Sequence, residues 1–335
     1  MSAEEKGVVV EAAIGPVEVA RAAERLAPWA RKTPVVTSGT LDDRCGCSVF
    51  IKCENFQKVG AFKFRGAMNA LLMLSPEVRA AGVITHSSGN HGQALACAGQ
   101  LLDVPVCVVM PRTAPAVKRE ATLGYGARVV LCEPNFAARD QAAAREIERY
   151  SYQMVHPFND WGVIAGQGTA ALELIAESGP LDLVMCPVGG GGLLAGTALA
   201  AAGSSPAPRV VGVEPEAADD ARRSLEAGVI QVSGDPATIA DGLRSTAVGV
   251  RPFAVFSRRV ERIVTVTEDQ IITATRFIWE RLKLVAEPSC AVPIAALMEG
   301  AIDARGLRVG VILSGGNVDL ETLLPILARQ SVDAR

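Results

Sequence analysis

The sequence predicts an α/β protein with two doubly wound parallel-sheet lobes. Short apolar runs rich in β-branched residues alternate with helical stretches, and strands that are apolar throughout are typical of a parallel sheet covered on both faces. The number of such strands exceeds what one compact sheet holds. Three of them end in glycine-rich turns, the position where such folds bind ligands.

The alternation begins at residue 82 and continues almost to the C-terminal end. The expected strands are 82–85, 104–110, 128–131, 181–186, 209–213 and 309–313. The expected helices that follow them include 92–98, 115–123, 136–150 and 193–202. No short-period repeat or long linker interrupts this order.

Composition and charge exclude several classes of partner. The 335 residues carry a net charge of −3 without a basic block, so we expect neither nucleic acid nor an anionic membrane as a partner. No apolar run reaches the roughly 18–20 residues that span a bilayer, and residues 1–6 lack the order of a secretion signal. We therefore expect a cytoplasmic protein. Its eight cysteines are scattered, and only Cys45 and Cys47 are close, so we expect reduced thiols, not a zinc site.

Four consecutive glycines, Gly189–Gly192, join an expected strand to a helix. Such a turn allows close backbone approach and directs several amide N–H groups at one anion, at a helix N-terminus. No Gly-Lys-Ser/Thr follows, so the turn is not a Walker A motif. We interpret it as a cradle for a phosphate monoester; the alternative is a flexible turn.

Two further polar turns follow expected strands. Ser87-Ser-Gly-Asn-His91 offers hydroxyl and amide groups at the start of a helix, which suit a carboxylate. The alternative is N-capping by a serine, and a lone histidine is more often structural than catalytic. Ser314-Gly-Gly-Asn317 by itself indicates only a turn.

Lys63 lies between two aromatic residues, Phe62 and Phe64, just before a helical stretch. Desolvation lowers the pKa of a lysine, and an amine is nucleophilic only when it is unprotonated. Taken alone, such a residue is more often a surface lysine whose stem packs on its neighbours.

Together these four segments resemble the fold-type II pyridoxal-phosphate (PLP) enzymes. The match is closest to the branch of serine racemases, serine/threonine dehydratases and threo-3-hydroxyaspartate ammonia-lyases. It runs from about Pro34 to Leu320 in the family's order, with further matching segments at 164–169, 239–242, 264–268 and 312–320. The resemblance implies a PLP cofactor between the two lobes, a large domain of residues 1–75 and 153–335, and a small mobile domain of residues 76–152.

The resemblance also implies roles for individual residues. Lys63 binds the cofactor covalently and later moves the α-proton of the substrate, and Ser88 is a proton donor on the opposite ring face. The implied cofactor contacts are Phe62, Asn90 at the phenolic oxygen, Gly189, Gly190, Gly191, Gly192 and Leu193 at the phosphate, and Ser314 at the pyridine nitrogen. The implied ligands of the substrate's α-carboxylate are Ser87, Asn90 and His91.

A divalent cation is the second implied cofactor. Two carboxylates, Glu214 and Asp220, lie six residues apart after an expected strand, and hard carboxylates suit Mg²⁺ or Ca²⁺. Acidic residues also simply begin helices. The resemblance implies Mg²⁺, or Ca²⁺ or Mn²⁺, on Glu214, the Ala218 carbonyl and Asp220.

The expected reaction follows from the implied partner of the pyridine nitrogen. Ser314 is neutral, so the ring is a weaker electron sink than one held protonated by an aspartate, and loss of the α-proton couples best to departure of a β-hydroxyl. We expect an ammonia-lyase, with racemisation through Ser88 as a companion activity. Ser88 as a helix cap is the alternative. Ala61, where relatives commonly have serine, and the dehydratase-like segment 156–160 weaken a racemase-only interpretation.

The expected substrate is a small β-hydroxy amino acid: L-threo-3-hydroxyaspartate, L-serine, or both. Arg139 can bind a β-carboxylate in bidentate fashion, and Ser245 can add a hydroxyl. The alternative for Arg139 is a solvated residue paired with Asp140 or Glu133. The remaining alternatives are a serine racemase, a catabolic threonine dehydratase, a β-replacement enzyme and a nucleotide-binding protein without activity. We expect a homodimer.

Overall fold

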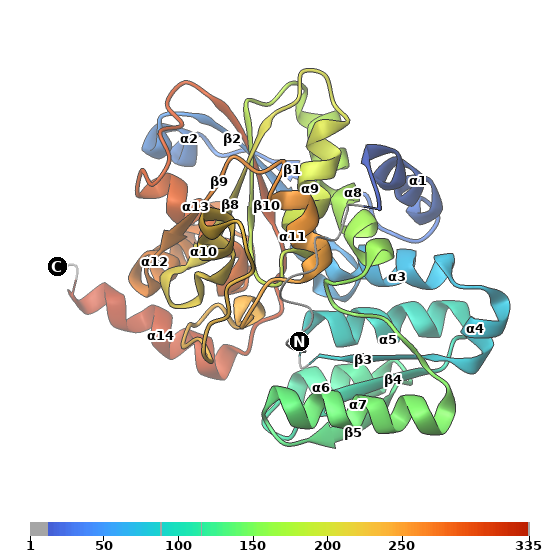
Figure 1. Ribbon diagram of the computed structural model, residues 1–335. Coiled ribbons are helices and arrows are strands. Elements are labelled where there is room, and N and C mark those ends of the chain that lie inside the picture. Colours follow the sequence, from blue (N-terminus) through green and yellow to red (C-terminus); the bar gives the residue numbers. More distant parts are fainter. Residues whose placement is uncertain (1–12, 88, 115, 334–335) are drawn as a thin grey trace.

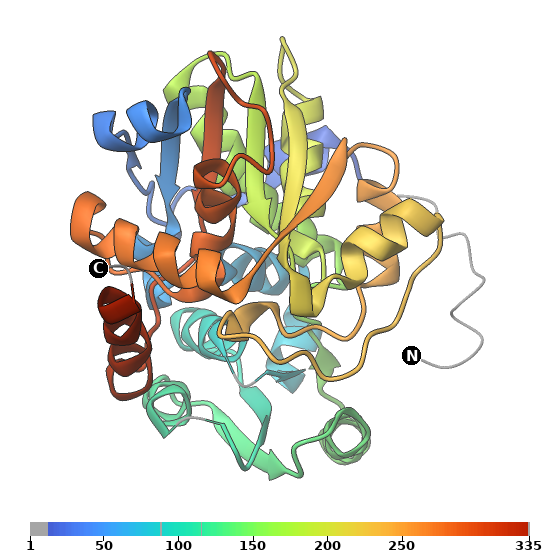
Figure 2. The same ribbon diagram turned by 90° about the vertical axis from the view of Figure 1, so that its left-hand side faces the viewer.

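The protein forms two parallel sheets, each covered by helices, in the computed structural model, which describes residues 13–87, 89–114 and 116–333 (Figure 1). The expected α/β class with two sheets is confirmed. The two sheets lie in separate parts of the molecule, and Figure 2 shows the smaller one below the larger.

The larger sheet has the strand order β1-β2-β10-β7-β8-β9. Its strands are β1 (Val35–Val36), β2 (Ser48–Cys53), β7 (Leu183–Pro187), β8 (Arg209–Pro215), β9 (Arg262–Val266) and β10 (Arg308–Leu313). All neighbours pair in parallel except β1 and β2. Three strands of this sheet, β1, β2 and β9, go beyond those expected from the sequence.

The smaller sheet has the strand order β5-β4-β3-β6, and all its pairs are parallel. Its strands are β3 (Val83–His86), β4 (Val106–Pro111), β5 (Arg128–Cys132) and β6 (Gln153–Met154). The last strand lies just beyond residue 152, the expected limit of the small domain. The division into two domains and the mobility of the smaller one stay predictions.

Fourteen α-helices connect and cover these strands in the described part of the chain. They are α1 (Pro16–Leu26), α2 (Gly39–Cys45), α3 (Lys63–Met73), α4 (Pro76–Ala81), α5 (Asn90–Leu102), α6 (Ala116–Gly124), α7 (Phe136–Tyr150), α8 (Trp161–Ser178), α9 (Gly192–Ala202), α10 (Asp220–Ala227), α11 (Val250–Phe256), α12 (Glu268–Phe277), α13 (Pro288–Met298) and α14 (Leu320–Asp333). Five shorter helical turns are η2 (Glu54–Phe56), η3 (Lys58–Gly60), η4 (Glu216–Ala218), η5 (Asp241–Leu243) and the π-helical η6 (Ile278–Leu282).

The larger sheet has a hydrophobic core on each face. One core joins its strands to α12 and α13, and the other joins them to α8 and α9. A third core packs α5 and α3 against the smaller sheet, whose other face is covered by α7. Apolar residues buried on both faces are the physical reason that these strands lack an alternating pattern.

All eight cysteines are free thiols, seven of them buried. Among the described residues, no helix is both long enough and apolar enough to cross a bilayer. The cellular compartment stays a prediction.

Candidate functional site

The segment before Lys63 is tied to the turn that follows β10. Ala61 forms an isolated antiparallel bridge with Gly315, and the Phe62 N–H donates to the Ser314 carbonyl oxygen at 3.0 Å. Ser314 is 2% exposed. Two of the segments singled out in the sequence, more than 250 residues apart, therefore meet at the carboxyl end of the larger sheet.

Lys63 is the first residue of α3, and its amine points into the protein. The Nζ atom donates a hydrogen bond to the Pro157 carbonyl oxygen at 2.9 Å and lies 5.1 Å from the ring centroid of Phe62. Burial lowers the pKa of Lys63 to about 8, and the nearby Glu287 opposes this shift. About one tenth of the amine is therefore unprotonated at pH 7, far more than for an ordinary lysine, and the unprotonated form is what a nucleophile or base requires.

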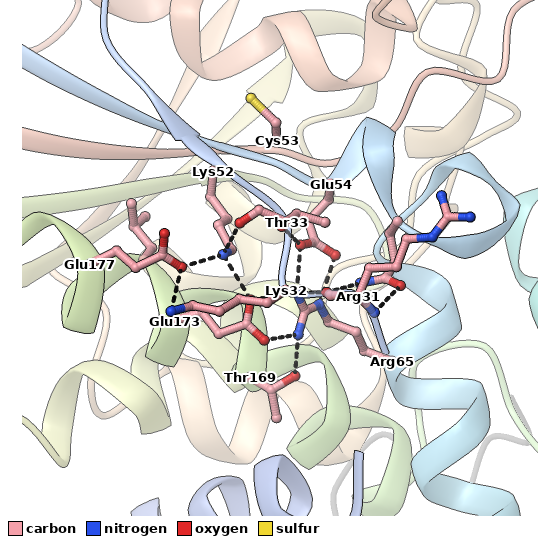
Figure 3. Close-up of polar contacts among 12 residues, drawn as sticks. Arg31, Lys32, Thr33, Lys52, Cys53, Glu54, Arg65, Thr169, Glu173 and Glu177 are labelled. Carbon is pink, nitrogen blue, oxygen red and sulfur yellow. Dashed lines mark hydrogen bonds and ion pairs between the residues drawn. The ribbon is translucent and has the colours of Figure 1, made fainter. Parts of the chain in front are cut away.

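Arg65 anchors the helix that carries Lys63. Its guanidinium binds Glu54 through Nε at 2.7 Å and Nη2 at 2.8 Å, and Glu173 through Nη1 at 2.6 Å and Nη2 at 2.8 Å (Figure 3). Lys52, fully buried on β2, continues the cluster by pairing with Glu173 at 2.7 Å and Glu177 at 3.1 Å. The first turn of α3 is thereby fixed to both β2 and α8, because each charge has a partner of opposite sign.

The glycine turn lies between β7 and α9 and packs closely on its surroundings. Gly191 has φ +87°, which favours glycine, and a Cβ on Gly190 would lie 2.3 Å from the ring of Phe158. Phe158 follows Pro157, the hydrogen-bond partner of Lys63. The amide nitrogens of Gly189, Gly190 and Gly191 donate no hydrogen bond within the described residues. Free amides at a helix N-terminus, without side chains in the way, fit a phosphate.

A second segment covers the glycine turn from the other side. A Cβ on Gly189 would lie 3.3 Å from the Gly242 carbonyl oxygen and 3.4 Å from Oγ of Ser245. Asp241, at the start of this segment, forms an ion pair with Lys118 of α6. Ser245 therefore lies at the glycine turn, and α6, which begins beside the smaller sheet, is linked to the same place.

Asn90 begins α5 and lies within a chain of polar side chains. Its Nδ2 donates to both carboxylate oxygens of Glu287, at 3.0 and 3.1 Å, and its Oδ1 accepts from Nδ2 of Asn317 at 2.9 Å. Burial raises the pKa of Glu287 to about 7. The sequence analysis missed Glu287. The one available signal was a lone acidic residue before Pro288, within an otherwise apolar stretch.

His86, His91 and His156 all have lowered pKa values. Burial is the main cause, and Lys63 adds to it for His91 and His156, whose pKa falls to about 3. His91 Nε2 lies 3.2 Å from the Val155 carbonyl oxygen, so this nitrogen carries the proton of the neutral ring. Its Nδ1 then has a lone pair and no proton to donate, so carboxylate binding by His91 rests on the resemblance alone.

Other residues that the resemblance assigns to substrate binding or proton transfer belong to segments around the smaller sheet. Ser87 follows β3, and its Oγ accepts from the Gly89 N–H at 3.2 Å, as a turn cap does. Ser88 lies outside the described residues. Arg139, in the first turn of α7, lowers the pKa of His86, the last residue of β3, and Asp140 raises it. His86 in turn packs edge-on against His156 at 5.3 Å.

Glu214 and Asp220 are both buried at the end of β8. Glu214 accepts from the backbone N–H groups of Ala221 at 3.1 Å and Arg222 at 2.9 Å. Oδ2 of Asp220 is buried and has no hydrogen-bond partner in the described part of the chain. The described residues contain no group of three or more His, Cys, Asp or Glu side chains that could hold a metal. An orphaned carboxylate oxygen beside a second buried carboxyl still fits a hard cation whose other ligands are a carbonyl and waters.

Comparison with known proteins places the chain in a family. The model of the family described as "Pyridoxal-phosphate dependent enzyme" matches residues 26–315. A serine racemase of Dictyostelium discoideum is 45% identical over 92% of this chain and 97% of its own length. An L-threo-3-hydroxyaspartate ammonia-lyase of Saccharomyces cerevisiae is 43% identical over 93% and 95%, respectively.

Solved structures give the same result. The crystal structure of a threonine deaminase from T.th. superposes with a TM-score of 0.86 and 43% sequence identity, covering 91% of this chain and 99% of that one. This likeness confirms the expected fold-type II architecture, and the matches span nearly the whole chain. The protein belongs to the pyridoxal-phosphate-dependent enzymes, in the branch whose members include ammonia-lyases and racemases.

Proposed function

We propose that this protein is an ammonia-lyase that removes water and ammonia from L-threo-3-hydroxyaspartate, giving oxaloacetate, and from L-serine, giving pyruvate. The observation that carries the proposal is the position of Lys63. Its amine donates to the carbonyl oxygen of Pro157, whose neighbour Phe158 packs on the glycine turn, and the residue before Lys63 is bonded to the Ser314 turn. The hydroxyaspartate ammonia-lyase and serine racemase among its relatives support the substrate class.

The proposed cofactor contacts are those that the resemblance implies, and the amides of the glycine turn that are free among the described residues support the phosphate contacts. Gly189, Gly190 and Gly191 offer amides to the phosphate, Ser314 offers a neutral hydroxyl to the pyridine nitrogen, and Asn90 offers an N–H to the phenolic oxygen. PLP, when bound there, withdraws electrons from the α-carbon of the substrate. A neutral Ser314 places no fixed charge at the ring, which favours immediate loss of a β-hydroxyl over a long-lived carbanion.

The protein's own residues then move protons and fix orientation. Lys63 accepts the α-proton at Nζ, and the Pro157 carbonyl orients the amine. The β-hydroxyl takes up the proton that Lys63 has accepted and leaves as water, and the enamine product hydrolyses in solution to a keto acid and ammonia. The substrate's β-carboxylate, where present, binds Arg139 and the Ser245 hydroxyl. Racemisation requires a donor on the opposite face, which we assign to Ser88.

Substitution of Arg139 tests the substrate assignment. Arg139→Ala removes a charged hydrogen bond to the β-carboxylate, a loss of about 2–4 kcal/mol, so we expect kcat/KM for hydroxyaspartate to fall roughly 30- to 1000-fold. L-Serine, which has no second carboxylate, loses much less. Keto acid release is measured on both substrates. The matched control is Arg145→Ala, an exposed residue of the same helix that binds Gln141. Equal losses on both substrates would leave serine as the better assignment.

We also propose that Mg²⁺, or Ca²⁺ or Mn²⁺, binds Glu214, the Ala218 carbonyl and Asp220. The support is the buried, unpartnered Oδ2 of Asp220 beside Glu214. The cation neutralises two carboxyl groups where β8 passes into α10, so its contribution is to stability. We further propose that the protein forms a homodimer and is located in the cytoplasm.

A further inference from the structure

The polar chain through Asn90 has a defined direction. Nδ2 of Asn317 donates to the Val59 carbonyl oxygen at 2.7 Å and to Oδ1 of Asn90 at 2.9 Å. A backbone carbonyl can only accept, so Asn317 must present its NH₂ group at this point. Asn90 then presents its oxygen to Asn317 and its NH₂ group to Glu287.

Glu287 therefore holds Asn90 in one orientation. A single N–H directed between the two carboxylate oxygens accounts for both distances, 3.0 and 3.1 Å. The second N–H of the amide stays available for a ligand. The donation from Asn317 also polarises the amide and makes that N–H a stronger donor.

Glu287 is also a buried titratable group beside the turn that holds the segment before Lys63: its N–H donates to the Gly315 carbonyl oxygen at 3.1 Å, and Gly315 bridges Ala61. The carboxyl is 3% exposed. Burial raises its pKa most, Asp241 of η5 adds to this, and Asn90, Lys118 of α6 and the backbone of Asn317 oppose it. Glu287 in turn raises the pKa of Lys63 and of the Cys290 thiol on α13.

We propose that Glu287 is a positioning residue of this enzyme, which fixes the amide of Asn90 and supplies a buried negative charge that acts on Lys63. Its role toward the cofactor rests on the proposed function, whereas its effect on Lys63 does not. Glu287 thus connects two features of the site, the Asn90 N–H proposed to bind the phenolic oxygen of PLP and the protonation state of the Lys63 amine.

Two substitutions separate the charge from the hydrogen bond. Glu287→Gln keeps an oxygen that accepts from Asn90 but removes the charge. Ionised Glu287 stabilises the ammonium form of Lys63, so the pKa of Lys63 falls without it. We expect roughly three- to tenfold faster acetylation of Lys63 near pH 7 in the cofactor-free protein, measured by competitive labelling and mass spectrometry. Glu287→Ala also removes the acceptor, and we expect the PLP dissociation constant to rise on the order of tenfold.

The control is Glu54→Gln, the same change at an equally buried carboxyl that faces Arg65. It should lower thermal stability and leave the titration of Lys63 unchanged. An unchanged Lys63 titration in Glu287→Gln overturns the proposal, and so does unchanged PLP affinity in Glu287→Ala. Should Glu287→Ala not fold, Asn317→Ser breaks the chain at its other end and must weaken PLP binding. The labelling needs no substrate, so a failed lyase assay does not decide it.

Discussion

At the scale of single residues, the site depends on a lysine kept partly neutral by burial. The pKa of Lys63 is about 8, below its ordinary value of 10.5, since desolvation disfavours the ammonium form. A lowered pKa means that the folded protein binds fewer protons than the unfolded chain between about pH 8 and 10.5. The contribution of Lys63 to folding stability therefore increases with pH across this window.

Replacement of Lys63 tests its place as the covalent anchor. Lys63→Ala should abolish turnover and the visible absorbance of bound PLP, because Lys63 supplies the amine beside Phe62 that would bind the cofactor covalently. Thermal unfolding should remain cooperative, since the substitution removes a buried amine and no ion pair. Absorbance spectra with and without borohydride provide the measurement. A variant that stays yellow and is fixed by borohydride at another lysine contradicts the assignment.

Some residues of the site could be predicted from the sequence, and others could not. Lys63, Asn90, the glycines and Ser314 lie in short segments whose composition indicates chemistry. Glu287 gives no such indication, because its importance comes from contact with Asn90, 197 residues away. The same holds for the ion pairs of Arg65 with Glu54 and Glu173: a sequence shows that charges exist but not which of them are buried together.

At the scale of elements, parallel strands buried on both faces could be predicted, and four others could not; one of the four is β6, which has only two residues. β2 contains Lys52, which is fully buried through its ion pairs, so its sequence lacks a continuous apolar run. β1 has only two residues. β9, with the sequence RIVTV, lies at the sheet edge, and only two of its five residues are buried. Each departs from the apolar pattern for a physical reason, a buried charge, a short length or an edge position.

The glycine turn provides the test at this scale. Gly190→Ala places a Cβ 2.3 Å from the Phe158 ring, so either the ring or the turn must move. A loss of about 2 kcal/mol in PLP binding corresponds to a roughly 30-fold higher dissociation constant. Absorbance titration of the cofactor-free protein measures it. Gly39→Ala, where a Cβ meets nothing within 4 Å, is the matched control and should bind PLP as the parent does. Equal PLP affinity in the two variants would contradict the assignment of the glycine turn to phosphate binding.

At the scale of the whole molecule, the carboxyl pair on β8 and α10 predicts a response to divalent cations. A cation that binds only the folded state stabilises it by mass action. We expect chelators to lower the melting temperature by several degrees and Mg²⁺ or Ca²⁺ to restore it, as seen by calorimetry. Glu214→Gln should lose this response, whereas Glu216→Gln, at an exposed residue two positions away, should retain it. If Glu214→Gln responds to cations as the parent does, the site lies elsewhere.

The Arg65 cluster has a consequence for how this family diversifies. It ties the lysine of the proposed reaction to β2 and α8, elements outside the smaller sheet. Most of the residues assigned to the substrate, Ser87, Asn90, His91 and Arg139, instead belong to loops and helices around the smaller sheet, whereas Ser245 lies at the glycine turn. Mutations that retune substrate choice can thus accumulate there without displacing the anchored amine. Serine racemases, hydroxyaspartate ammonia-lyases and a threonine deaminase are among the proteins that this chain resembles, and a fixed amine beside variable substrate contacts is a physical arrangement that allows such variety.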